Sequence, residues 1–189
     1  MTALPIKRSK LSVIIIEKKG GGIDTIFLRD KDFKFCLNCR ECMQNPGPNP
    51  EPCVQIDTMK EIVEKLECAD ALVLASPTNL GSVTALFKRF MERLSVYAYW
   101  SWGSPAPKYR KDNIPKKEKK KALLVSSSAA PGILSRWFFS TIRQLKYTAR
   151  IIGANPIGII NNGLIAMSSD KKLTEKDIKK IKKQADKIL

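Results

Sequence analysis

Histidine is absent from this chain of 189 residues, and that absence removes several kinds of active site. Without an imidazole there is no Ser–His or Cys–His nucleophile pair, no His-ligated metal ion and no imidazole acid–base step. Any chemistry must therefore come from cysteines, carboxylates, backbone groups or a bound cofactor.

Long apolar runs are missing as well. No stretch approaches the ~18 apolar residues that a membrane-spanning helix needs. The basic start, MTALPIKRSK, lacks the apolar core and the small-residue cleavage site of a secretory signal. We therefore expect a cytoplasmic protein without a membrane partner, in which the five cysteines form no disulfides.

Acidic residues are few beside the basic ones. There are 34 Lys and Arg against 18 Asp and Glu, which gives a formal net charge of +16 and a pI near 9.8. Such a field attracts polyanions or acidic proteins, although a lysine-rich solvated surface is the favoured interpretation and is common in heat-adapted proteins. Aromatic residues are not interleaved with the lysine runs as they are in a base-stacking platform, so we do not expect nucleic acid as the partner.

Four of the five cysteines lie in one segment, FCLNCRECMQNPGPNPEPC. Cys36, Cys39 and Cys42 are separated by two residues each, and ten residues rich in proline and glycine precede Cys53. This pattern matches the C-x2-C-x2-C core of iron–sulfur ligation with a later fourth cysteine, whereas zinc more often takes two separated C-x2-C pairs. The spacing favours a [4Fe–4S] cluster on sulfurs that face one point, and it leaves zinc and unligated thiols open. Cys68 is expected to be a buried helix residue.

The rest of the chain alternates short apolar runs with helical patterns, which is typical of an α/β sheet protein. No repeat or linker divides the chain, so we expect one domain over 1–189, with a cysteine-rich insertion at about 35–55. GGG at 20–22 leaves no room for a crossover, so a helix is favoured over a strand for 11–19. The expected strands are 23–30, 71–78, 121–128 and 154–161. The expected helices start at the N-caps Asp57 and Ser82, span 135–152 up to Gly153, and begin again near Thr174 and Asp177.

Two loops rich in small residues follow neighbouring strands. Residues 76–82 read SPTNLGS and residues 126–132 read SSSAAPG. Parallel strands place their ligands at their carboxyl ends, where backbone N–H groups and a helix dipole can meet an anionic ligand. Together the two loops predict a pocket for a flat cofactor held largely by backbone groups.

Three segments of the chain carry a family resemblance: FCLNCRECM with its later cysteine, ADALVLASPTNLGSVTALFKRFMER, and KKALLVSSSAAPG. Over roughly residues 5 to 165 the chain resembles the flavodoxin-like NAD(P)H-dependent FMN reductases, and in particular the iron–sulfur flavoproteins. The resemblance implies a flavodoxin-like three-layer α/β sandwich with a parallel sheet ordered 2-1-3-4-5 and FMN at its carboxyl edge. It assigns the cluster to the four cysteines above, and FMN to Ser76, Pro77, Thr78, Asn79, Gly81, Ser82, Ser127, Ser128 and Gly132.

The start of the chain departs from the family pattern. Members begin with a strand and a phosphate-binding loop, but only ALPIKRSKLS stands in that place. Pro5 and Ser9 are the remnants of this loop, and Ser9 is the one cofactor-binding residue expected there. The first strand is therefore expected to be missing or reduced.

The leading hypothesis is an FMN-dependent oxidoreductase in which a cluster connects the flavin to a one-electron partner. Its donor would be NAD(P)H or an acidic redox protein such as a ferredoxin, which a basic surface favours, and a homo-oligomer is expected. The cofactors would do the chemistry, so no side chain is assigned as catalytic. The alternatives are a non-enzymatic zinc- or nucleic-acid-binding module and a degenerate flavodoxin-like subunit without FMN.

Overall fold

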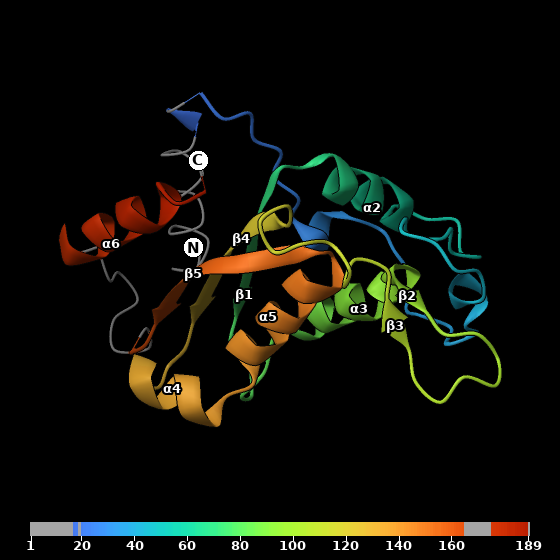
Figure 1. Cartoon of the computed structure of the whole chain (residues 1–189). Helices are drawn as coiled ribbons and strands as arrows, with labels where there is room; N and C mark the ends of the chain where they lie inside the picture. Colours follow the sequence, from blue (N-terminus) through green and yellow to red (C-terminus); the bar gives the residue numbers. More distant parts are fainter. Residues whose placement is uncertain (1–16, 19, 165–174, 189) are drawn as a thin grey trace.

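A parallel sheet forms the centre of the computed structural model, which describes residues 17–18, 20–164 and 175–188. The strands are β1 (Ala71–Pro77), β4 (Lys120–Ser127) and β5 (Ala154–Asn162), hydrogen-bonded in the order β1-β4-β5 (Figure 1). The three sequence-predicted strands 71–78, 121–128 and 154–161 are thereby confirmed. Helices separate them along the chain, as parallel crossovers require.

One face of the sheet packs against α2 (Met59–Cys68), α3 (Ala85–Arg93) and α5 (Thr141–Ile151). Side chains alternate along a strand, so Leu72, Leu74 and Leu124 all point to this face. Each of the three helices contributes an apolar stripe at helical spacing. The buried members of the stripes are Met59, Ile62, Leu66, Phe87, Phe90, Met91, Ile142, Leu145 and Ala149.

The opposite face is covered by α6 (Glu175–Ala185), drawn in red at the left of Figure 1. Leu123 and Val125 of β4 and Ile160 of β5 pack there against Ile181, and all four are fully buried. Helices therefore lie on both faces of the sheet, which is the three-layer arrangement predicted from the sequence.

A smaller antiparallel pair lies beside the sheet. It joins β2 (Ala98–Tyr99) to β3 (Lys108–Tyr109) and follows η3 (Leu94–Tyr97). Residues 35–55, which we call the cysteine loop, run next to this pair on the right of Figure 1 and include η2 (Glu41–Met43). Trp100 N–H donates to the carbonyl of Met43 at 2.8 Å and ties the two together.

The predicted strand at 23–30 is wrong. The segment has no regular structure until η1 (Leu28–Asp30). Ile26 and Leu28 are partly buried against the core, so this apolar segment packs on the core instead of pairing with a strand. The expected features of residues 1–16, including Ser9 and the reduced first strand, lie outside the described residues.

The predicted single helix at 135–152 is also wrong, because it is two helices. α4 (Gly132–Phe138) ends at Phe139, whose backbone is extended, and α5 begins after Ser140. Ser140 N–H donates to the carbonyl of Gly81 at 2.8 Å, so a contact with the 76–82 loop interrupts the helix. The end at Gly153 is confirmed by its φ of 82°.

Helix starts differ from the prediction by small shifts. α3 starts after Thr84, whose hydroxyl accepts from Phe87 N–H at 3.2 Å, and not at Ser82. At α2 the N-cap is Thr58 and not Asp57, although the Asp57 carboxylate, one residue earlier, accepts from Met59 N–H at 3.0 Å. α6 begins at Glu175, and Thr174 lies outside the part of the chain that the structure describes. Among the described helices none is long and apolar enough to cross a membrane.

Candidate functional site

The carboxyl ends of the three strands meet at one edge. Pro77, Ser127 and Asn162 are neighbours in register across the sheet. Thr78 N–H donates to Ser127 O at 2.8 Å, and Ser128 N–H donates to Asn162 O at 2.7 Å. The loops 76–82 and 126–132 therefore lie side by side at this edge, as the sequence predicted.

Buried hydroxyl groups line this edge. Ser127 and Ser128 are buried, and Thr78 Oγ1 lies 2.9 Å from Thr141 Oγ1. Ser127 Oγ has no hydrogen-bond partner among the described residues. A buried polar atom without a partner is costly and calls for a ligand or a water molecule. The edge thus fits a polar cofactor that completes the hydrogen bonds of Ser127.

The loop 76–82 ends in a tight turn. Asn79 N–H donates to Ser82 O at 2.9 Å and Ser82 N–H donates to Asn79 O at 3.0 Å. Between them Leu80 and Gly81 have φ values of 47° and 79°, as the two central residues of a type I′ turn do. Leu80 is fully exposed at the tip. Because Ser140 holds the Gly81 carbonyl, the turn has a fixed position.

Several of the predicted cofactor-binding residues use their side chains in hydrogen bonds within the protein. Ser76 Oγ accepts from Thr84 N–H at 3.2 Å, Ser82 Oγ accepts from Gln144 Nε2 at 2.8 Å, and Ser128 Oγ donates to Ala130 O at 3.0 Å. These serines shape the loops through their side chains and leave their backbones at the edge. Pro77 ends β1 and Gly132 begins α4.

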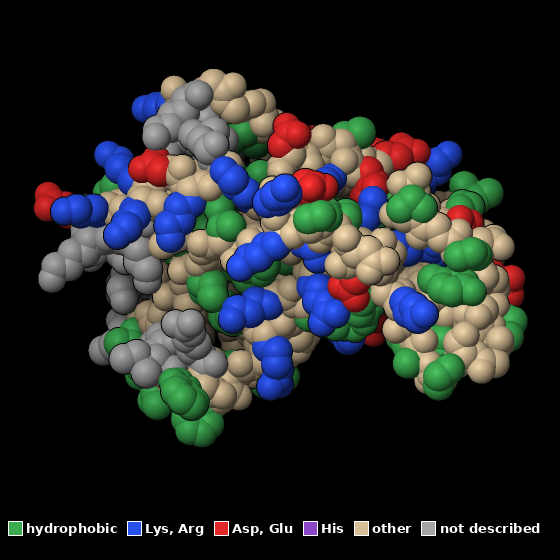
Figure 2. Space-filling view, viewed as in Figure 1, with side chains coloured by type: hydrophobic (Ala, Val, Ile, Leu, Met, Phe, Trp, Pro, Cys, Tyr) green, Lys and Arg blue, Asp and Glu red, His purple; other side chains and the backbone are tan. Residues whose placement is uncertain are grey.

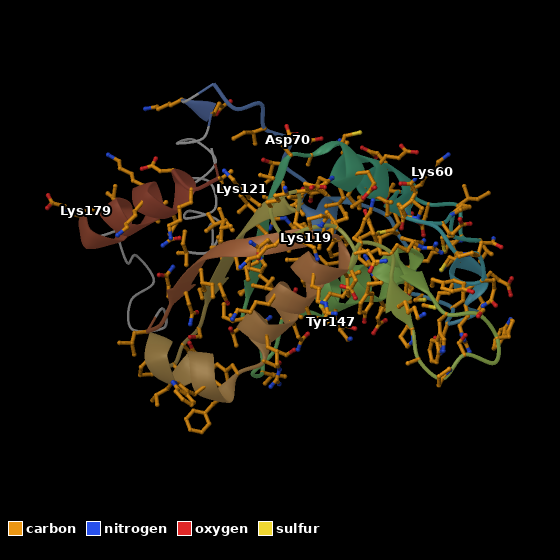
Figure 3. The ribbon with its side chains drawn as sticks, viewed as in Figure 1. Lys60, Asp70, Lys119, Lys121, Tyr147 and Lys179 are labelled. Carbon is orange, nitrogen blue, oxygen red and sulfur yellow. The ribbon has the colours of Figure 1, made fainter. Side chains whose placement is uncertain are left out.

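A cavity of about 630 Å³ adjoins this turn between α3 and α5. Asn79, Leu80 and Ser82 line it together with Gln144 and Tyr147 of α5; Tyr147 is labelled in Figure 3. The sequence reasoning missed Thr141, Gln144 and Tyr147. They lie in the predicted 135–152 helix, and no local pattern shows that this helix would return to the 76–82 loop.

The cysteine loop has an irregular backbone held by long-range hydrogen bonds. Asn38 and Arg40 adopt left-handed φ values of 54° and 63°, and Cys36 Sγ accepts from Asn38 N–H at 3.4 Å. Gln55 Nε2 donates to Phe35 O at 2.8 Å and brings the two ends of the loop together. The turns at 38 and 40 allow the chain to change direction between successive cysteines.

The four thiols lie near one another around Cys42. Burial raises the pKa of the Cys42 thiol to about 11, and the neighbouring thiols of Cys53, Cys36 and Cys39 add to the rise. However, no group of three or more Cys, Asp or Glu side chains in the described ranges is arranged to hold a metal ion. The expected convergence of the sulfurs on one point is therefore not confirmed. The donor set itself, soft thiols without a carboxylate among them, fits iron–sulfur or zinc chemistry.

Cys68 lies outside the cysteine loop, at the end of α2. It is exposed, so its predicted burial is wrong.

Arg93 of α3 anchors both ends of the cysteine loop. Its guanidinium forms a two-point ion pair with Asp57, at 2.5 and 3.1 Å, and donates to Lys34 O at 2.9 Å. Both side chains are almost fully buried. Burial favours the neutral acid, but hydrogen bonds from Arg93, Lys34 N–H and Met59 N–H together with the charge of Arg93 hold the pKa of Asp57 below its usual value. The pair fixes residues 34 and 57, two positions before Cys36 and four positions after Cys53.

Arg40 and Arg110 attach the loop to the β2–β3 pair. The guanidinium of Arg40 stacks between Trp100 and Trp102, 3.9 and 4.3 Å from their ring centres, a cation–π arrangement. Arg110 donates to the carbonyls of Cys42 and Gly47. No local pattern in the sequence indicates these arginine contacts.

Comparison with known proteins shows which family the chain belongs to. Residues 12–135 match the family described as NADPH-dependent FMN reductase. The chain belongs to this family. The curated proteins it resembles include an iron–sulfur flavoprotein of Archaeoglobus fulgidus, 31% identical over 94 residues, which are 47% of this chain and 44% of the relative. Another, from Methanocaldococcus jannaschii, is 36% identical over 74 residues, 38% of this chain and 36% of the relative. The chain thus spans less than half of the length of these relatives.

A solved structure supports the fold. An FMN-dependent NADH-azoreductase from Bacillus anthracis, determined in complex with FMN, aligns with a TM-score of 0.69. The alignment covers 98% of this chain and 91% of the azoreductase at 13% sequence identity. At this identity the likeness establishes the flavodoxin-like fold and not the activity.

Proposed function

We propose that this FMN reductase family member binds FMN at the carboxyl edge of its sheet and acts as a flavin-dependent oxidoreductase. The observation that carries the proposal is the buried Ser127 hydroxyl, which has no hydrogen-bond partner among the described residues and lies where the 76–82 and 126–132 loops meet. Bound FMN would supply hydride or single-electron transfer. The family match and the FMN-bound azoreductase of the same fold support the choice of cofactor.

The chain's own residues would orient the flavin and exclude water. The fixed Asn79–Ser82 turn and the buried serines of β4 present backbone groups and a hydroxyl to one side of the edge. Leu80, whose side chain is fully exposed at the tip of the turn, would shield the ring edge from solvent. No charged side chain of the described residues is assigned a catalytic step.

Titration of FMN into wild type and Ser127→Ala tests the proposal through two opposite effects. Removing an unpartnered buried hydroxyl should raise the stability of the cofactor-free chain by about 1 kcal/mol. Loss of its bond to FMN should weaken FMN affinity about tenfold, equivalent to ~1.4 kcal/mol. Ser95→Ala, which removes a hydroxyl bonded to Glu92 O beyond α3, is the matched control. Unchanged FMN affinity in Ser127→Ala would contradict this site.

We also propose that Cys36, Cys39, Cys42 and Cys53 hold a [4Fe–4S] cluster. Support comes from the spacing, from the mutual proximity of the thiols around Cys42 and from the iron–sulfur flavoproteins among the relatives. The thiols would have to move closer together as they bind, which the irregular backbone of the loop allows. Free thiols of this kind also fit a reducing compartment such as the cytoplasm.

Anaerobic reconstitution with iron and sulfide tests the cluster. Analysis of iron, sulfide, zinc and flavin, with an absorbance spectrum, separates the candidates. Cys39→Ser should lose bound iron while the sheet stays folded by circular dichroism. Cys68→Ser is the control, because Cys68 is exposed on α2 and remote from the loop in sequence. Zinc without iron would indicate the zinc-binding alternative, and a colourless, metal-free and flavin-free protein the degenerate subunit.

The electron donor is proposed to be NAD(P)H or an acidic redox protein such as a ferredoxin. Lys and Arg side chains spread over the face shown in Figure 2, and Figure 3 places Lys119 and Lys121 near β4 and Lys179 on α6. Attraction between exposed charges is screened at high ionic strength. Flavin reduction by an acidic ferredoxin should therefore slow as salt rises, whereas reduction by NAD(P)H should depend on salt much less. Light scattering tests the expected homo-oligomer.

A further inference from the structure

We propose that Arg110 is the positioning residue and counter-charge for the anionic metal centre of the cysteine loop. The inference rests on the cluster proposed above and concerns a residue outside the cysteine motif. Arg110 follows β3 in the sequence, 68 positions after Cys42, and no motif in the sequence connects the two.

The guanidinium of Arg110 is buried against the loop, with 8% of the residue exposed. It donates to three backbone carbonyls: Val96 at 3.0 Å, Cys42 at 3.2 Å and Gly47 at 3.3 Å. Two of these carbonyls belong to the cysteine loop, one of them to a cysteine. The guanidinium has five N–H groups, so two are left after these bonds.

The charge of Arg110 has no ion-pair partner in the part of the chain that the structure describes. Among the described residues no carboxylate lies within ion-pair distance of it, whereas Arg93, the other buried arginine at this loop, has Asp57 at 2.5 Å. Glu51 acts on the charge of Arg110 only from beyond ion-pair distance. An uncompensated buried cation is strongly unfavourable. Arg93 is therefore neutralised by Asp57, whereas Arg110 has no such partner among the described residues.

A metal centre held by four thiolates carries net negative charge and would supply an opposite charge for Arg110. Protonated thiols carry no charge and would give no such compensation. Binding of the centre would bring the anion next to a cation that the fold has already placed and oriented. The competing partner is water in a cavity of about 580 Å³ that Arg110 also lines, in which case the metal centre would not sense its charge.

Two variants separate charge from hydrogen bonding. Arg110→Lys keeps the charge and loses the planar fork, and Arg110→Gln keeps a neutral donor and loses the charge. Arg150→Gln is the control, because it removes the same charge from an exposed pair with Asp112. Each full-length protein is reconstituted anaerobically, and iron and sulfide content and the midpoint potential of the centre are measured at fixed pH and ionic strength.

A nearby cation stabilises the form of the centre that has gained an electron, so its removal should make the midpoint potential more negative. We expect Arg110→Gln to show a lower potential or loss of the centre, with Arg110→Lys and Arg150→Gln close to wild type. Equal midpoint potentials in all four proteins would overturn the counter-charge role. So would a lowered potential or loss of the centre in Arg110→Lys together with a wild-type potential in Arg110→Gln. Misfolding of both Arg110 variants without metal would also overturn it and assign the residue to folding alone. A wild type that takes up no metal would instead refute the cluster itself.

Discussion

The carboxyl edge of the sheet and the cysteine loop are both candidate cofactor sites, but different forces build them. Backbone hydrogen bonds between parallel strands place Thr78, Ser127 and Ser128 at the edge. Buried guanidinium groups hold the loop, through Arg93 and Arg110. The difference shows that a regular sheet can position a site by itself, whereas an irregular loop needs charged side chains from distant parts of the chain.

The two regions should therefore respond differently to mutation. The edge depends on apolar packing beneath it and on one tight turn. The loop depends on a buried ion pair, which contributes little net stability when intact but leaves an unpaired buried charge when one partner is removed. Four predictions test this contrast.

The largest effect is expected at the ion pair of the cysteine loop. Arg93→Met leaves the buried Asp57 carboxylate unpaired and should lower the free energy of unfolding by about 3–5 kcal/mol. Urea denaturation measures it. Arg150→Met, which breaks an exposed pair with Asp112, should cost less than about 1 kcal/mol. The double variant Arg93→Met/Asp57→Leu should recover part of the loss, and no recovery would show that packing and not charge is responsible.

A core substitution beneath the carboxyl edge should come next. Leu124 on β4 is fully buried, so Leu124→Ala removes apolar contacts and leaves a cavity, at a cost of about 2–5 kcal/mol. Ile56 is 97% exposed in the segment that closes the cysteine loop, and Ile56→Ala should change stability by less than about 0.5 kcal/mol. Thermal unfolding of both variants measures the two losses of stability. Similar losses would mean that Ile56 is covered in solution.

The turn at the edge should give a smaller effect. Gly81 has a φ of 79°, and an alanine Cβ there would meet Phe139 only at an ordinary distance of 3.5 Å. The cost of Gly81→Ala is therefore backbone strain of about 1–2 kcal/mol. Gly22→Ala, with open space around it, is the control. A neutral Gly81→Ala would indicate that the turn relaxes in solution.

The smallest change is expected from protonation of Asp57. Its pKa is depressed in the folded chain, so the stability from this group is present above its unfolded pKa, near 3.8, and is lost as the pH falls through the lower folded value. The stability difference between wild type and Asp57→Asn should accordingly shrink below about pH 4. Denaturation series from pH 7 to pH 2.5 measure it. A difference that stays constant would show that Asp57 is not depressed.

The sequence predicted the sheet and the edge because both follow from local patterns. Continuous apolar runs marked β1, β4 and β5, and the small residues after two of them marked the loops that meet there. The prediction failed at 23–30, where an apolar run was taken for a strand although its residues only pack against the core. It failed again at residue 139, where the contact of Ser140 with Gly81 divides a helix whose pattern is continuous.

The sequence by itself determined the α/β class, the order of the main elements, the two edge loops and the concentration of thiols between 36 and 53, because each depends on residues that are close along the chain. The tertiary structure alone decided which arginines hold the cysteine loop and which buried hydroxyl at the edge has no partner in the part of the chain that is described. Arg93 meets Lys34 across 59 positions and Arg110 meets Cys42 across 68. Contacts over such separations leave no periodic pattern, since they depend on how the packed elements bring the chain back upon itself.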